Sequence, residues 1–113
     1  MAFYDLREYM EACDNAGEMV TIDREIDWNL EAGAISRRIC EIGAPMAHMT
    51  NIRGVDYGAT ILGSPMSKGW QSDFARIAIG LQLDPSATYE QLMDEFMNRM
   101  AHPIRPMEVK SGP

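Results

Sequence analysis

The stretch from Glu18 to Ile52, EMVTIDREIDWNLEAGAISRRICEIGAPMAHMTNI, predicts a strand–helix–strand unit. Its two ends, EMVTID and MAHMTNI, are short apolar segments, and the middle segment LEAGAISRRICEIGA carries a helical repeat. Such a unit buries one face of a small sheet under one helix, and everything else must pack onto it. This stretch therefore decides the fold class.

The helix inside this stretch is expected to begin near Asp27 or Asn29, which are both good N-cap types. Gly43 and Pro45 are expected to stop it. Its predicted buried stripe consists of Leu30, Ala34, Ile35, Ile39 and Ile42. In the strand before it, Val20 and Ile22 alternate with polar residues, which is typical of a half-buried strand.

A further helix is predicted before the stretch. Asp5 is a suitable N-cap, Glu8 stands three residues later as in a capping box, and Gly17 suits the left-handed position that ends a helix. The apolar stripe of this helix is Leu6, Tyr9, Met10 and Cys13. We expect Leu6 and Ile39 to be core residues, so that replacing either by Ala costs about 2–5 kcal/mol.

The residues after the stretch predict one more strand and two more helices. Residues 59–63 are a short apolar strand, and the glycines between it and the strand at 46–52 predict a hairpin. The third helix is marked by Trp70, Phe74, Ile77, Ala78 and Leu81. The fourth begins with a capping box of Thr88 and Gln91, and its apolar positions are Tyr89, Leu92, Met93, Phe96 and Met100.

The predicted fold is therefore α/β, or α+β: a mixed sheet of three or slightly more strands packed by about four helices in a single domain. We expect this domain to span residues 1–103. Residues 104–113 have no periodicity and are rich in Pro and Gly, so we expect an extended exit segment that leads toward a further, missing domain.

The totals exclude several classes of partner. The 113 residues carry a net charge of −7, with 17 carboxylates against 10 cations, and the only adjacent basic pair is Arg37-Arg38. This argues against a nucleic-acid partner, which needs clustered cations. No apolar run approaches the roughly 20 residues that cross a bilayer, and the first residues do not resemble a signal peptide, so we expect a cytoplasmic protein without a membrane partner.

Five features of the sequence are candidate sites, and each also has a structural interpretation. Cys13 and Cys40 are expected to be reduced core thiols, with a disulfide or a reactive thiol as the alternative. Asp23, Glu25 and Asp27 would share one face of an extended chain, where they could hold a hard cation. A solvated strand end is the favoured interpretation, because Trp28 occupies the position where a calcium loop needs Gly.

His48 is expected to be structural, because no Cys or His spacing suggests zinc. Arg38 is expected to be an exposed helix arginine, with a ligand contact as the alternative. The loop SPMSKG at 64–69 lacks the spacing of a phosphate-binding P-loop. No catalytic, cofactor-binding or metal-binding residue is therefore assigned from the sequence.

An ordered series of motifs along the whole chain resembles the N-terminal domain of the UbiD-type decarboxylases. The motifs are Asp5-Leu6-Arg7, Gly17-Glu18, Ile22-Asp23-Arg24-Glu25, Leu30-Glu31, Asn51-Ile52-Arg53-Gly54, Leu62-Gly63-Ser64, Ile79-Gly80-Leu81, His102-Pro103-Ile104-Arg105-Pro106 and Ser111-Gly112-Pro113. The chain departs from the family at His48 and Thr50, which interrupt a usually more apolar strand, and in the SPMSKGWQS loop.

The resemblance implies a parent enzyme that reversibly decarboxylates aromatic or α,β-unsaturated acids without oxidation. The implied cofactor is prenylated FMN with a divalent metal and a monovalent cation, none of it bound by this chain. In the family the flavin ligands and the Glu-Arg-Glu catalytic network lie in the central domain. The implied partners are therefore the flavin-binding and C-terminal domains of the same enzyme, and the parent is expected to be a homo-oligomer.

Two alternatives of other classes remain open from the sequence. One is a freestanding small subunit or assembly scaffold of a multi-subunit carboxylase or decarboxylase, which the 10 methionines and the acidic surface allow. The other is an independent binder of a small ligand.

Overall fold

The computed structural model describes residues 2–112, so Pro113 of the predicted exit segment lies outside the described residues. The elements in chain order are α1 (Leu6–Asn15), β1 (Met19–Ile22), α2 (Glu31–Ile42), β2 (Met46–Met49), β3 (Ile61–Gly63), α3 (Ala75–Gly80) and α4 (Tyr89–Ala101). The strands form one sheet in the order β1-β2-β3. Strand β1 is parallel to β2, and β2 is antiparallel to β3. The predicted fold class, a small mixed sheet packed by four helices, is confirmed for the described residues.

The sheet separates two apolar clusters. On one face, Ala32 and Ile39 of α2 pack against Ala47 and Met49 of β2. On the other face, Tyr9 and Cys13 of α1 pack with residues of β2 and α3. This follows from the pleat of β2, because neighbouring residues of a strand point to opposite faces of the sheet.

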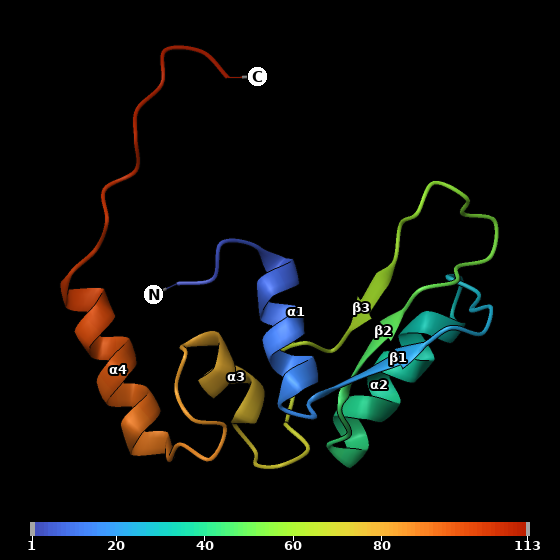
Figure 1. Cartoon of the computed structure of the whole chain (residues 1–113), viewed down its shortest axis with the longest axis horizontal. Coiled ribbons are helices and arrows are strands. Elements are labelled where there is room, and N and C mark those ends of the chain that lie inside the picture. The colour runs from blue at the N-terminus through green and yellow to red at the C-terminus, as the bar shows by residue number, and fades with distance from the viewer. Residues whose placement is uncertain (1, 113) are drawn as a thin grey trace.

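Figure 1 shows how these layers follow one another. The sheet and α2 lie at one end of the molecule, α1 and α3 occupy the middle, and α4 lies at the opposite end. Helix α1 contacts both β1 and α3, and so joins the two halves. The segment after α4 has no helix or strand and extends away from the rest of the molecule.

Local signals fixed the ends of α1 as predicted. The carboxylate of Asp5 accepts hydrogen bonds from the backbone N–H groups of Arg7 and Glu8. At the other end, Gly17 has φ 75°, where a side chain would be strained. Its N–H donates to the carbonyl of Asp14, and the N–H of Glu18 donates to the carbonyl of Cys13. These two bonds form a Schellman motif, which turns the chain directly into β1.

Four predicted core positions are wrong. Leu6 is 58% exposed, because the first turn of α1 extends past the edge of the core and lines an open cleft. Leu30 is 82% exposed and precedes the helix with φ 70°, and Ala34 and Ile42 are exposed as well.

The rest of the predicted stripe of α2 is correct. Ile39 is buried against the sheet, and Ile35 packs against the same cluster. Ala32, which was not expected in the core, is buried beside them.

Replacing Ile39 by Ala should lower the free energy of unfolding by about 2–5 kcal/mol, because the side chain is enclosed between α2 and the sheet. Leu6→Ala is the matched control, and it should change stability by less than about 0.5 kcal/mol, because it removes an exposed side chain. Urea unfolding followed by circular dichroism measures both. Equal losses in the two variants would contradict the burial described above.

Candidate functional site

The most elaborate polar arrangement is an ion pair in the interior between Glu18 and Arg76, whose side chains are both 0% exposed. Glu18 stands at the corner between α1 and β1, and Arg76 lies in the first turn of α3. One Nη of Arg76 donates to the Glu18 carboxylate at 3.1 Å. Sequence analysis missed this pair. The one indication of a buried charge is that Arg76 is the only charged residue between Asp73 and Asp84.

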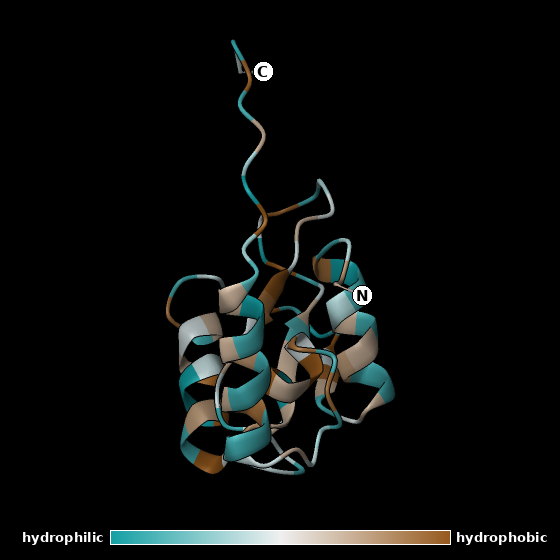
Figure 2. Ribbon diagram, turned by 90° about the vertical axis from the view of Figure 1, so that its left-hand side faces the viewer, coloured by the Kyte–Doolittle hydropathy of each residue, from teal (hydrophilic) through white to brown (hydrophobic). Residues whose placement is uncertain are grey.

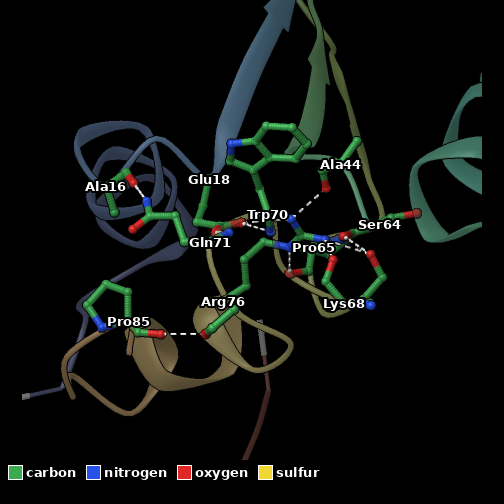
Figure 3. Close-up of polar contacts among 12 residues, drawn as sticks. Ala16, Glu18, Ala44, Ser64, Pro65, Lys68, Trp70, Gln71, Arg76 and Pro85 are labelled. Carbon is green, nitrogen blue, oxygen red and sulfur yellow. Dashed lines mark hydrogen bonds and ion pairs between the residues drawn. The ribbon is translucent and has the colours of Figure 1, made fainter. Parts of the chain in front are cut away.

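The whole guanidinium is satisfied by the surrounding chain (Figure 3). A guanidinium carries five N–H donors. Besides Glu18, the acceptors are the carbonyls of Pro65, Ala44 and Lys68 and the hydroxyl of Ser67, at 2.7 to 3.1 Å. All five donors thus have a partner, as a charge buried away from water requires.

The Glu18 carboxylate is equally well occupied. It accepts from the backbone N–H of Trp70 at 2.9 Å and from that of Gln71 at 2.7 Å. These bonds hold residues 70 and 71 outside any helix, so α3 begins at Ala75 rather than near Trp70 as predicted. The indole of Trp70 remains largely exposed.

The loop at 64–69 is therefore built around a cation of the protein itself. Its carbonyls of Pro65 and Lys68 and the hydroxyl of Ser67 point toward Arg76. A phosphate site needs the opposite arrangement, with N–H groups turned toward the ligand. This loop does not fit the phosphate of a flavin, because its acceptors are turned toward Arg76, and the arrangement stabilises the fold.

The predicted acidic group is divided among ion pairs. Arg53 bridges Glu25 at 3.0 Å and Asp27 at 3.1 Å. Asp23 is exposed and lies outside these pairs. Within residues 2–112, no group of three or more His, Cys, Asp or Glu is placed to hold a metal ion. Two of the three carboxylates are thus paired with Arg53.

His48 and Arg38 have neighbours consistent with the structural interpretation. A ring nitrogen of His48 lies 3.0 Å from the Thr60 hydroxyl, at the wall of an open cleft that α1 also lines. Arg38 is exposed on α2 and pairs with Glu41 at 3.4 Å.

None of the helices described between residues 2 and 112 is long and apolar enough to cross a membrane.

The two cysteines are free, and they differ in environment. Cys13 is fully buried, and burial raises the pKa of its thiol. Cys40 is exposed, contrary to the expected core thiol. Hydrogen bonding to Ser64 and then to Ser67 lowers the pKa of the Cys40 thiol, and its sulfur lies 3.2 Å from the Ser64 hydroxyl.

A parallel strand–helix–strand unit, extended by a hairpin and covered on both faces, defines the chain as a small α/β module. Residues 10–96 match the family described as 3-octaprenyl-4-hydroxybenzoate carboxy-lyase N-terminal domain. The chain belongs to this family, which confirms the resemblance stated above to the UbiD-type decarboxylases.

Several decarboxylases are similar to this chain. Pyrrole-2-carboxylic acid decarboxylase of Pseudomonas aeruginosa is 33% identical over 96% of this chain, and ferulic acid decarboxylase 1 of Saccharomyces cerevisiae is 30% identical over 93%. The chain spans only 23% and 22% of their lengths. The solved closed form of vanillic acid decarboxylase from Sedimentibacter hydroxybenzoicus shares the fold, with a TM-score of 0.79 over 97% of this chain and 22% of that chain, at 22% identity.

Breaking the buried ion pair should destabilise the protein strongly. Glu18→Gln and Arg76→Met should each lower the free energy of unfolding by about 3–5 kcal/mol, because each leaves the opposite charge buried without its partner. The double variant should lose less than the sum of the two, by at least about 1 kcal/mol. Arg38→Met on the surface of α2 is the control and should be close to neutral. Urea unfolding of all four variants tests this, and strictly additive losses would contradict a coupled pair.

Cys40 should react with a disulfide reagent in the native protein, whereas Cys13 should react only after unfolding, because it is buried and its pKa is raised. Ser64→Ala should move the midpoint of the pH–rate profile of Cys40 upward, since the serine hydroxyl favours the thiolate. Ser64 also donates to the Ser36 carbonyl at 2.8 Å. A downward shift would mean that its single proton stays there and that the thiol is the donor.

Proposed function

We propose that this chain is the N-terminal domain, not catalytic on its own, of a UbiD-like enzyme that reversibly decarboxylates aromatic or α,β-unsaturated carboxylic acids. The observation that carries the proposal is the match to a carboxy-lyase N-terminal domain over residues 10–96, together with decarboxylase relatives of which the chain spans under a quarter. These relatives are named for the decarboxylation of pyrrole-2-carboxylic acid and of ferulic acid, which supports the substrate class.

The proposed boundary follows the end of α4. Residues 1–103 form the domain, and residues 104–113 lead toward the flavin-binding domain. The remaining partners are the C-terminal domain of the same polypeptide and further copies of the enzyme in a cytoplasmic homo-oligomer. No nucleic acid or membrane takes part.

The proposed cofactor is prenylated FMN with a divalent metal and a monovalent cation, held by the other domains. It would supply the electron sink for loss of carbon dioxide. In this proposal the described residues do not hold the cofactor, and the loop at 64–69, which turns its acceptors toward Arg76, supports this. The contribution of this chain is a rigid body, fixed by the Glu18–Arg76 pair, against which the catalytic domains are positioned.

The complete polypeptide from the natural source, reconstituted with prenylated flavin, should release carbon dioxide from aromatic or α,β-unsaturated acids. The 113-residue chain given the same cofactor should not, because it offers no site for it. Intact mass of the natural protein is measured first. A natural product of about 12.7 kDa would contradict the proposal and favour the freestanding subunit or scaffold. A complete polypeptide that carries flavin and turns over none of these acids would contradict the substrate class.

A further inference from the structure

Helix α4 carries an apolar stripe that the described chain leaves mostly uncovered. The stripe consists of Tyr89, Leu92, Met93, Phe96, Met97 and Met100. Their spacing places them along one side of the helix. Only Leu92 is buried, and Met100 is 61% exposed. A short helix in water owes most of its stability to packing of such a face, so this one lacks a covering element.

The first half of the stripe forms one wall of an apolar groove between α3 and α4. The groove has a volume of 280 Å³, and its lining residues are Phe74, Ile77, Leu81, Tyr89, Leu92, Met93 and Phe96. At its mouth the rings of Phe74 and Tyr89 lie 5.9 Å apart between centroids. No polar atom lines its surface, so the groove fits an apolar side chain and offers nothing to a polar ligand.

The apolar surface continues beyond the helix. Ile104, Met107 and Val109 follow α4 along the extended segment, and Ile104 is 96% exposed. Figure 2 shows hydrophobic residues in brown at intervals along this segment, which rises clear of the helices. In Figure 1 the segment continues from the end of α4 that lies farther from α3, so groove, stripe and segment form one strip. Apolar surface gathered in this way marks an interaction site.

We propose that this strip is the docking surface for the remainder of the same polypeptide, and that an apolar element of the next domain fills the α3–α4 groove. This inference rests on the proposed function. The relatives are more than four times as long as this chain, so an element joined through residues 102–112 has the length of chain to reach the groove. Covalent linkage gives such an element an effective concentration on the order of millimolar.

The charges beside the strip favour this occupant over a membrane. Along α4 the exposed acidic residues Glu90 and Asp94 outnumber the one basic residue, Arg99. The extended segment carries Arg105 and Lys110 against Glu108. Anionic lipid surfaces attract basic segments, and the α4 part of the strip is acidic. The element that fills the groove should therefore have an apolar centre with basic residues on the side that faces α4.

The test uses the complete polypeptide and trypsin cleavage after Lys110, which is exposed here and should be shielded when the strip is docked. Met100→Glu places a charge in the stripe, and it should accelerate this cleavage by about tenfold or more, because an unpaired charge is costly to bury. Asn98→Glu is the matched control. It adds the same charge two residues away on the opposite side of α4, and it should leave the rate unchanged. Circular dichroism of both variants verifies that the helices remain folded.

Equal cleavage rates in wild type and both variants would overturn the inference, because the strip would then be uncovered. Protection that depends on protein concentration, lost together with a dimer, would also overturn it by assigning the strip to a second copy. The decarboxylation assay is independent of both readouts. A polypeptide that shows the Met100→Glu effect without decarboxylating any acid would leave the docking surface standing and refute the proposed function alone.

Discussion

The structure depends on one constraint, which is that the charge of Arg76 is buried and every N–H of its guanidinium must find an acceptor. Those acceptors come from three separate segments: the corner before β1, the corner before β2, and the loop between β3 and α3, which supplies three of the five. The position of Glu18 is set in turn by the Schellman motif that ends α1, and its carbonyl accepts from Met46 where the parallel pairing begins. The ion pair therefore links the end of α1, the corner before β2, the loop at 64–71 and α3.

Such a pair does more to restrict the chain to one conformation than to raise the net free energy of unfolding. Removing two charges from water costs several kcal/mol, and their attraction recovers this only when all remaining hydrogen bonds are made. Here they are made, and the consequence is geometric: residues 64–71 have one conformation that satisfies Arg76 and Glu18 together. The loop carbonyls and the Ser67 hydroxyl that bind Arg76 are therefore not available to a ligand.

Features made by residues close together in the sequence were predicted correctly, and features that depend on residues far apart in the sequence were not. The caps at Asp5, Gly17 and Thr88 were predicted correctly, because each is made by residues within a few positions of the helix end. The buried face of α2 was predicted only in part. Ile35 and Ile39 pack on the sheet as expected, whereas Leu30, Ala34 and Ile42 are exposed. The apolar residues of α2 span a broad arc of the helix, and the spacing alone does not tell which edge of that arc turns toward the sheet. The early start expected for α3 failed for a different reason. Glu18, more than fifty residues away, takes the N–H groups of Trp70 and Gln71 that a helix would have used.

Helix α4 is stabilised by local interactions that do not require its apolar stripe to be covered. The capping box of Thr88 and Gln91 and the ion pair of Arg99 with Glu95 one turn away are local, so they act whether or not the apolar stripe is covered. Each such interaction contributes only a few tenths to about 1 kcal/mol, which biases the segment toward helix without burying it. The stripe is then presented in one orientation, and the ordering cost of docking is reduced because the helix is already formed. The two kinds of interaction are thus separated in space: the buried Glu18–Arg76 pair lies where α1, α3 and the sheet meet, and the exposed apolar residues lie along α4.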